Sequence, residues 1–484
     1  MKVAIIPCAG LGVRFHELGK RYPKALLPFN GMPILKHIID KIYLSVDEIR
    51  ITCREDQENL INFVRNLGLP NIRSVMVPYE GPQGPARSFM EAVDGAETGV
   101  LLHLSDSLFD FKFYESNIDW ISTMPVADPS RWCMYDGQDY FDKQPSVPRG
   151  AQALSGVYNF SDPYHLKEVY DRVFGTANLH EELEISELLS VYGKAHNFQQ
   201  LMHSADDFRD FGTIDNYLIN NKAAPFRKFN RLEFDDKIRV VTKISEDYPN
   251  KVFSEYFWFK NFPLEFQRFL PKVLEINIPG CSFSMEKIDA VKLRDLFLWI
   301  DRDPLVWKEI FDEVKTFLDL CADRSIKSSF WAEELSKFKQ RRPDKISVFL
   351  EIEALLREVG VYGEATLFHG DLHFNNMFYD FSSKRLSLID PRGSLYGHWI
   401  YDVAKLVQSC IGLFDFIDAR LTRDDGKVAY IYSDGVEPIQ SVFTDFFLSG
   451  LSEKQLELVY KLTAALFLTM QPLHQDQSGK FVFF

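Results

Sequence analysis

A glycine-containing loop near the N-terminus is the first feature of the sequence that could do chemistry. The apolar run Val3–Ile6 predicts a buried strand, which leads into a loop holding Gly10, Gly12 and Arg14. Glycine has no Cβ atom and tolerates positive φ, so backbone N–H groups in such a loop can approach phosphate oxygens. Lys24 follows in a segment flanked by prolines. The loop and the two cations together predict a polyphosphate-binding site.

These N-terminal motifs resemble those of the sugar-phosphate and phosphocholine nucleotidyltransferases. That family has an A-G-x-G-x-R segment followed by P-K-x-L-x-P, and this sequence reads Ala9-Gly10-Leu11-Gly12-Val13-Arg14 and then Pro23-Lys24-Ala25-Leu26-Leu27-Pro28. Three further segments match in the same order: Glu80–Ala86, His103–Asp106 and Arg209–Thr213. The resemblance covers residues 1–222. It implies a loop with Gln83 and Gly84 at the nucleobase, and metal-binding aspartates at Asp106 and Asp210.

Attack of a phosphate oxygen on the α-phosphorus of an NTP brings two polyanions together, so cations are needed. The resemblance implies that Asp106 and Asp210 hold Mg²⁺, while Arg14 and Lys24 act on the triphosphate beside the Gly10 and Gly12 loop. No protein nucleophile is required. Asp142-Lys143-Gln144-Pro145 is similar to the family's E-K-P segment, whose lysine contacts the acceptor phosphate. Lys143 is therefore expected to bind substrate, although Gln144 is extra relative to the pattern.

A second constellation lies near the C-terminus. His369-Gly370-Asp371-Leu372-His373-Phe374-Asn375-Asn376 is followed by Leu388-Ile389-Asp390-Pro391-Arg392-Gly393. The segments supply an aspartate, an asparagine five residues later and a second aspartate beyond a predicted hairpin. This order resembles protein kinases and the aminoglycoside and choline phosphotransferases, and the match spans residues 228–484.

That resemblance implies that Asp371 accepts or orients the proton of the substrate hydroxyl, and that Asn376 and Asp390 hold Mg²⁺ on the phosphates of ATP. We expect His369 to pack under the loop. Tyr401-Asp402-Val403-Ala404-Lys405 is similar to the family's D-x-A-K helix, so Asp402 is expected to support the loop rather than touch substrate. Two readings of His373 stay open, contact with substrate and a solvated or capping role.

The nucleotide lobe carries a weaker pattern. Lys243, in a predicted strand, could contact the α and β phosphates of ATP, with Glu255 at the head of the next helix as its ion-pair partner. The candidate phosphate loop Lys228–Leu232 contains no glycine, which departs from protein kinases. Met285–Ile288 fits a hinge to the adenine, or an ordinary edge strand. We expect the aromatic residues after position 291 to pack in the core rather than form a cation-binding cage, namely Trp299, Trp307, Phe330, Trp331, Trp399 and Tyr401.

The elements that must position these residues differ between the two halves. Strand-like and helical runs alternate over the first 110 residues, which predicts a mostly parallel α/β sheet, and the resemblance specifies a Rossmann-like nucleotidyltransferase domain of GT-A-like type. In the second half, apolar and polar residues alternate over 231–245 as in antiparallel strands. The pattern predicts a short helix over 253–262 and a mainly helical chain beyond 291. That predicts an α+β, protein-kinase-like, two-lobed domain. We place the nucleotidyltransferase domain at 1–222, the kinase N-lobe at 223–290 and the C-lobe with the acceptor site at 291–484.

Composition excludes several function classes. The 484 residues are 46% hydrophobic and carry 55 Lys and Arg against 69 Asp and Glu, a net charge of −14. This acidic balance disfavours a surface built for nucleic acid. The six cysteines lack metal-binding spacing, so we expect reduced thiols, and no run reaches the ~20 apolar residues of a membrane-spanning helix. We expect a cytoplasmic protein acting on small molecules, with a homo-oligomer left open.

The two resemblances together suggest consecutive reactions. A hydroxyl compound would be phosphorylated by ATP, and the product would be coupled to a nucleotide from a second NTP with release of pyrophosphate. One reading gives a nucleotide sugar for a surface glycan or capsule, and the other gives CDP-choline or a similar compound. Asp390-Pro391-Arg392-Gly393 departs from the I-D-[WF]-E form common in choline kinases. A third reading has one active domain and one binding or regulatory module.

Overall fold

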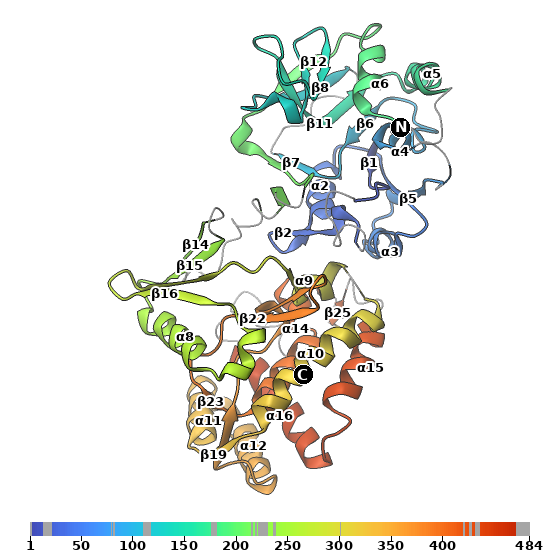
Figure 1. The fold of residues 1–484 in the computed structure, drawn as a ribbon. Coiled ribbons are helices and arrows are strands. Elements are labelled where there is room, and N and C mark those ends of the chain that lie inside the picture. Colours follow the sequence, from blue (N-terminus) through green and yellow to red (C-terminus); the bar gives the residue numbers. More distant parts are fainter. Residues whose placement is uncertain are drawn as a thin grey trace. The chain divides into compact units, whose positions relative to one another are not determined.

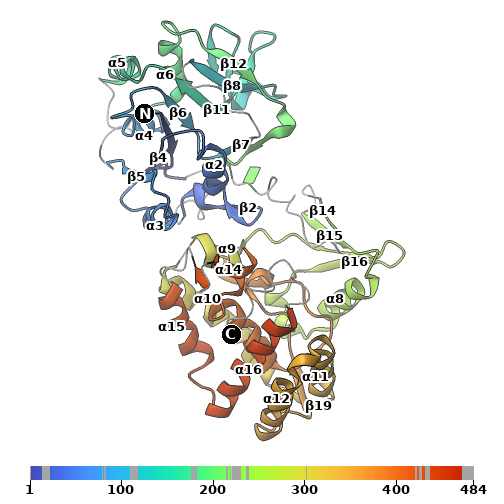
Figure 2. The same ribbon diagram turned by 180° about the vertical axis from the view of Figure 1, so that it is seen from behind.

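The computed structural model describes residues 2–12, 22–78, 80, 83–109, 118–175, 182–213, 216–217, 220, 231–235, 239–300, 302–419, 422–424, 428–430 and 436–470. The chain folds into two compact units, Met1–Ala224 and Pro225–Phe484 (Figures 1 and 2). The boundary predicted from the sequence, after residue 222, lies two residues earlier. Within the described ranges, no helix combines the length and the apolar composition needed to cross a bilayer.

The first unit is built on a parallel sheet. Strand β1 (Val3–Pro7) lies between β4 (Glu48–Cys53) and β6 (Val100–His103), and β5 (Ile72–Met76) extends the sheet beyond β4; all these pairs are parallel. Every residue of β1 is buried, as expected for a central strand covered on both faces. The predicted strand and helix alternation is confirmed.

Three helices connect or cover these strands: α2 (Ile34–Ile42), α3 (Glu58–Asn66) and α4 (Pro85–Met90). In α2, Ile34, Leu35, Ile38, Ile39 and Ile42 are buried, which is the one-sided pattern of a helix packed on a sheet. Helix α4 begins at Pro85, because proline fits the first helical position, where its missing N–H costs nothing.

An antiparallel half completes the sheet. Strand β11 (Gln152–Phe160) runs antiparallel to β6 and also pairs with β8 (Trp120–Met124) and β9 (Cys133–Tyr135). The outer strands are β10 (Tyr140–Asp142) and β12 (Gln199–Met202). A separate two-stranded ribbon joins β7 (Ser107–Phe109) to β13 (Phe208–Asp210).

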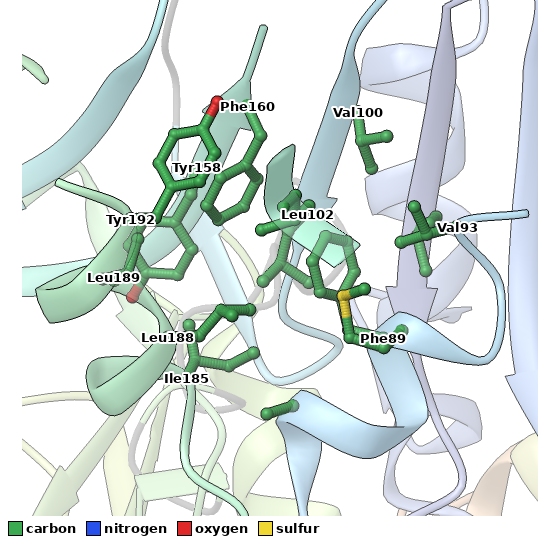
Figure 3. Packing of buried hydrophobic residues seen from close by; sticks show 14 of the residues in the cluster. Phe89, Val93, Val100, Leu102, Tyr158, Phe160, Ile185, Leu188, Leu189 and Tyr192 are labelled. Atoms are coloured by element: carbon green, nitrogen blue, oxygen red, sulfur yellow. The ribbon is translucent and has the colours of Figure 1, made fainter. Parts of the chain in front are cut away.

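The core of this unit lies between the sheet and the helices α4 and α6 (Ile185–Tyr192), with α5 (Pro163–Phe174) beside α6. Figure 3 shows Phe89 and Val93 beside Leu102 and Val100, with Tyr158 and Phe160 close to the α6 residues Leu188, Leu189 and Tyr192. The rings of Phe89 and Phe160 are 5.6 Å apart, and those of Phe160 and Tyr192 are 5.2 Å apart in an edge-on arrangement.

The second unit begins with an antiparallel sheet in the order β14 (Arg231–Asp235), β15 (Val240–Ile244), β17 (Ser282–Glu286) and β16 (Val273–Asn277). Helix α8 (Pro249–Asn261) packs on β16 and β17. The strand that reaches Glu286 is central, which excludes the edge-strand alternative for Met285–Ile288. The expected position of Glu255 was wrong: α8 begins at Pro249, so Glu255 lies in its second turn instead of at its head.

The rest of this unit is mainly helical, as predicted. Its longer helices are α10 (Pro304–Ala322), α11 (Phe330–Arg341), α12 (Ile346–Glu358), α13 (Trp399–Cys410), α15 (Val436–Phe447) and α16 (Glu453–Met470). Two small sheets lie among these helices. One contains β18 (Val291–Lys292), β21 (Met377–Asp380) and β22 (Arg385–Leu388), and the other contains β19 (Ser325–Lys327), β20 (Glu364–Leu367) and β23 (Tyr396–Gly397). Trp299, Trp307, Trp331 and Tyr401 are buried, which confirms core packing for these four. All six cysteines are free thiols.

The carboxylate of Asp119 ties the antiparallel half of the first unit together. It accepts hydrogen bonds from Ser161 N (2.7 Å) and Oγ (2.8 Å) and from the Tyr192 hydroxyl (2.9 Å), and His196 Nδ1 lies 3.0 Å away. These partners come from the end of β11, the end of α6 and the segment after it. Asp119 itself, which precedes β8, thus joins two regions far from it in the sequence, the end of β11 and the end of α6.

Replacing Asp119 with alanine is expected to destabilise the first unit by about 2–3 kcal/mol, because several partly buried donors lose their acceptor. The melting temperature of that unit, measured by differential scanning calorimetry, should fall by about 5–10 °C. Asp136→Ala is the matched control. Asp136 accepts N–H bonds within an exposed turn, and its loss should shift the transition by less than half as much. Equal shifts would contradict the assigned role.

Candidate active sites

Two side chains of the β4–α3 turn hold the N-terminal glycine loop. Arg54 Nη1 donates to the carbonyls of Ala9 and Gly10, both at 2.7 Å, and Gln57 Nε2 donates to the carbonyl of Cys8 at 3.1 Å. Three consecutive carbonyls are thus satisfied by protein donors. Gly10 has open space where a Cβ would stand, and Gly12 has φ of 67°. The predicted role of Arg14 falls outside the described residues.

Lys24, Asp106 and Asp210 come together at the end of β6. Lys24 Nζ forms an ion pair with Asp106 Oδ2. The β7–β13 ribbon places Asp210 opposite Ser107, and Phe211 N donates to the carbonyl of Asp106 at 2.7 Å. The register of this ribbon therefore brings the two aspartates side by side although 103 positions separate them in the sequence.

A glycine leaves room between the two carboxylates. A Cβ on Gly212 would lie 3.0 Å from Asp210 Oδ1 and 3.6 Å from Asp106 Oδ2, so both oxygens border the space that this residue leaves empty. Burial raises the pKa of Asp210, and the negative charge of Asp106 raises it further. Two carboxylates held close together in this way need a cation, which Lys24 supplies here.

Gln83 and Gly84 precede helix α4 and contact the segment before α6. Leu183 N donates to the carbonyl of Gln83 at 2.8 Å, and Ala86 N donates to the carbonyl of Leu183 at 3.0 Å. Gly84 has φ of 114°, and a Cβ there would lie 2.5 Å from the backbone of Leu183. Only glycine allows this approach. The nucleobase role of Gln83 and Gly84 stays a prediction.

Lys143 lies in a turn after β10. Its Nζ is 3.5 Å from Glu184 and 3.7 Å from Asp142, and about half of the side chain is exposed. Nearby along the chain, an open cavity of about 310 Å³ is lined by residues that include Arg131, Trp132 and Phe208. Arg131 is close enough to Asp210 to lower the pKa of that carboxyl in part. The acceptor role of Lys143 stays a prediction.

The second site is a loop between β20 and β21. The buried Asp402 carboxylate on α13 accepts hydrogen bonds from His369 N (2.7 Å) and Gly370 N (2.8 Å). His369 is fully buried, with Nε2 2.9 Å from the carbonyl of Ile389. The supporting roles predicted for Asp402 and His369 are confirmed. His373 is buried rather than solvated, with Nε2 3.4 Å from Asp371 Oδ2.

A hairpin brings the remaining residues together, as predicted. Strands β21 and β22 pair with Met377 opposite Leu388, and just outside this pair Ile389 N donates to the carbonyl of Asn376 at 3.0 Å. Asn376 Nδ2 lies 3.0 Å from the carbonyl and 3.3 Å from Oδ2 of Asp371. Asp390 follows with φ of 54°.

Lys243 connects the nucleotide lobe to this loop. Its Nζ lies 2.5 Å from Glu255 Oε2 and 2.8 Å from Asp390 Oδ1. Burial alone would lower the pKa of Lys243, but Asp390 and Glu255 outweigh burial and raise it, so the amine is charged. The predicted Lys243–Glu255 ion pair is confirmed, while nucleotide binding by these residues stays a prediction. The Lys228–Leu232 loop lies mostly outside the described residues.

Sequence reasoning gave no role to several side chains that complete these sites. Lys405 Nζ lies 3.1 Å from Asp371 Oδ1, and Arg392 Nη2 lies 2.5 Å from Glu334 Oε2 on α11. The three-residue spacing between Asp402 and Lys405 could have indicated that both face the loop, since residues at that spacing share a helix face. Arg54 and Glu334 gave no such signal, because their partners are distant in sequence.

Both sites offer oxygen donors of the kind that Mg²⁺ prefers. Asp106 and Asp210 border the space beside Gly212, and the hairpin bonds Asn376 to Ile389, the residue before Asp390. Within the described ranges, no group of three or more His, Cys, Asp or Glu side chains is placed to hold a metal ion. An ion at either site would therefore complete its coordination with nucleotide phosphates and water, as is usual for Mg²⁺.

Comparison with protein families matches each half of the chain separately. Residues 4–118 match the MobA-like NTP transferase domain, and residues 300–435 match the phosphotransferase enzyme family. The first match contains Lys24 and Asp106, and the second contains Asp371, Asn376 and Asp390. Each family thus coincides with one of the two constellations.

Individual relatives match part of the chain. It is 40% identical over 164 residues to the "Bifunctional protein GlmU" of Methanocaldococcus jannaschii, covering 32% of this chain and 39% of that protein. It is 26% identical over 190 residues to the "Putative mannose-1-phosphate guanyltransferase" of Sulfolobus acidocaldarius, covering 36% and 51%. The chain therefore spans about two-fifths to one-half of the length of these curated relatives.

Solved structures align over a little less than half of this chain. A putative glucose-1-phosphate thymidylyltransferase from Bacillus anthracis aligns at 18% identity with a TM-score of 0.41, covering 48% of this chain and 98% of that one. A UDP-glucose pyrophosphorylase in complex with UDP-glucose aligns at 18% identity with a TM-score of 0.38, covering 46% and 98%. From the two family matches, the chain joins an N-terminal NTP transferase domain of the MobA-like kind to a C-terminal domain of the phosphotransferase enzyme family.

Proposed function

We propose that this protein makes a nucleotide-activated sugar in two steps. The C-terminal unit would transfer the γ-phosphoryl group of ATP to a sugar hydroxyl, and the N-terminal unit would couple that sugar phosphate to a nucleotide from a second NTP. The observation that carries the proposal is the presence of both charge constellations in one chain. A phosphate monoester is the product of the first chemistry and the nucleophile of the second, so the two reactions fit in sequence.

In the first step, the acceptor oxygen attacks the γ-phosphorus of ATP and the bond to the β–γ bridging oxygen breaks, with the electron pair leaving on ADP. Asp371 would take the hydroxyl proton, and Lys243 would hold the α and β phosphates. Asn376 and Asp390 would hold Mg²⁺, which neutralises phosphate charge when bound. Lys243 Nζ is already paired with Asp390, so the phosphate-binding amine and the proposed metal ligand lie side by side.

In the second step, an oxygen of the sugar phosphate attacks the α-phosphorus of the NTP and pyrophosphate leaves. Lys24 would bind the triphosphate beside the Gly10 and Gly12 loop, and Asp106 and Asp210 would hold Mg²⁺. The cavity with Arg131 is suited to the acceptor, because a guanidinium can pair with its phosphate. The proposed product would be a donor for a surface glycan or capsule, and its synthesis from two nucleoside triphosphates suits the cytoplasm.

The charge pattern near the catalytic loop favours a neutral acceptor over choline. Glu334 is paired with Arg392, Asp371 with Lys405, and Asp415 with Arg294 at 3.7 Å. Carboxylates that already have cationic partners attract a quaternary ammonium group weakly. A sugar needs no uncompensated carboxylate. The relative named for mannose 1-phosphate also supports a sugar phosphate at the N-terminal unit.

The decisive experiment is mass spectrometry of the products formed from Mg²⁺, ATP, the other NTPs and a mixture of neutral sugars, with choline and ethanolamine in a parallel reaction. The proposal expects a nucleoside diphosphate sugar, whose mass identifies the nucleotide and the acceptor class. A CDP-amino alcohol would replace the sugar assignment with the choline one. Formation of a sugar phosphate but no nucleoside diphosphate sugar would show that only the C-terminal unit is active on these substrates.

Single substitutions should separate the two steps. Asp371→Ala should reduce ATP-dependent phosphorylation by at least about 100-fold, because the acceptor hydroxyl loses its base, while conversion of supplied sugar 1-phosphate continues at the native rate. Asp106→Ala should have the opposite effect, so that sugar phosphate accumulates. Both are measured by product quantification on folded variants. Loss of both activities in either variant would contradict this division of labour.

Lys243→Met should weaken ATP use at the C-terminal site by about 100-fold in kcat/KM, since the amine between Asp390 and Glu255 would no longer reach the phosphates. Nucleotidyl transfer from supplied sugar 1-phosphate should be unchanged. Lys339→Met is a matched control, because Lys339 also pairs with a glutamate, Glu353, at 3.1 Å on the helical side of the same unit. Steady-state kinetics at varied ATP distinguishes the two variants.

A further inference from the structure

A second cation lies at the catalytic carboxylate of the C-terminal site. Lys405 Nζ is 3.1 Å from Asp371 Oδ1, and only 12% of the lysine side chain is exposed. Lys405 comes from helix α13, one turn after Asp402. Asp402 holds the backbone N–H groups of His369 and Gly370 at 2.7 and 2.8 Å. The same helix therefore anchors the loop and delivers an amine to its catalytic side chain.

The loop orients Asp371 through residues other than Lys405. Asp371 Oδ2 has Asn376 Nδ2 at 3.3 Å and His373 Nε2 at 3.4 Å, while its backbone N–H faces His369 Nδ1 at 3.3 Å. These partners come from the loop itself. The Lys405 amine on Asp371 Oδ1 is not needed to orient the Asp371 side chain. This points to a role for Lys405 that depends on its positive charge.

In the proposed reaction, the negatively charged phosphoryl group passes close to Asp371 and Lys405. It crosses from ATP to an acceptor oxygen that Asp371 contacts, and negative charge spreads over its three equatorial oxygens during transfer. Lys243 supplies positive charge at the other end, where it pairs with Asp390 and Glu255. A fixed cation beside Asp371 would stabilise the group on the acceptor side.

We propose that Lys405 is a catalytic residue that donates a hydrogen bond from Nζ to an equatorial oxygen of the phosphoryl group in flight. The acceptor oxygen bonds to the γ-phosphorus, the bond to the bridging oxygen breaks with its electrons leaving on ADP, and the hydroxyl proton goes to Asp371. Lys405 keeps its proton throughout. This assignment rests on the proposed phosphotransferase activity of the C-terminal unit.

The test uses a mimic of the phosphoryl group in transit. Isothermal titration calorimetry measures the binding of ADP with Mg²⁺ to the full-length protein, with and without aluminium fluoride, in the presence of the neutral sugar mixture. Aluminium fluoride beside ADP imitates the planar, charged phosphoryl group. Lys405→Met should weaken the aluminium fluoride complex by about 100-fold, as for loss of one oxyanion donor, and change the affinity for ADP alone by less than about 3-fold.

Two further variants separate this role from a structural one. Lys405→Arg should recover part of the lost aluminium fluoride affinity, because the charge and a donor remain. Lys461→Met is the matched control: Lys461 pairs with Glu351 at 2.6 Å on the surface of the same unit, and its loss should change neither affinity. Equal weakening of ADP and of the aluminium fluoride complex in Lys405→Met would indicate a distorted site and overturn the proposal.

A double substitution decides whether Lys405 acts through Asp371. In the Asp371→Asn background, Lys405→Met should still weaken the aluminium fluoride complex by about the same factor, because the two side chains would contact different groups. No further loss in that background would make Lys405 a positioning residue for Asp371 and overturn the proposal. A native protein that forms no aluminium fluoride complex would refute the phosphotransferase function itself, which is a different outcome.

Discussion

Both sites depend on lysine side chains that compensate grouped carboxylates. Asp106 and Asp210 border one small space, and Asp390 and Glu255 converge on one amine. Grouped negative charges of this kind are unfavourable without a cation, because they repel each other in a region of low dielectric constant. Lys24 and Lys243 provide that cation. The arrangement therefore keeps carboxylates together at each candidate site.

In each unit, the pairing of backbone strands positions the side chains of the candidate site. In the first unit, the β7–β13 ribbon sets the second aspartate opposite the first, and the missing side chain of Gly212 leaves space between them. In the second unit, the β21–β22 hairpin returns the chain so that Ile389, the residue before Asp390, is hydrogen-bonded to Asn376. Strand register, rather than any flexible loop, therefore fixes which oxygens face one another.

Further side chains hold the loops of the two candidate sites in place. Arg54 and Gln57 donate hydrogen bonds to three consecutive carbonyls of the glycine loop, and Asp402 accepts hydrogen bonds from the backbone N–H groups of His369 and Gly370. In each case one helix or turn satisfies the loop backbone from behind. Loops held in this way can present their remaining polar groups to a ligand without the cost of ordering them at the moment of binding.

The sequence by itself determined the two domain types, the order of the motifs and the identity of Asp371, Asn376 and Asp390 as one constellation, because these features depend on local patterns and short spacings. Only the tertiary structure decided that Lys405 reaches Asp371, that Glu334 pairs with Arg392 and that Arg54 holds the glycine loop. Those contacts join residues on different elements. Their geometry depends on how helices pack and strands pair. The Asp402–Lys405 spacing indicates a shared helix face, but it does not say which residue that face meets.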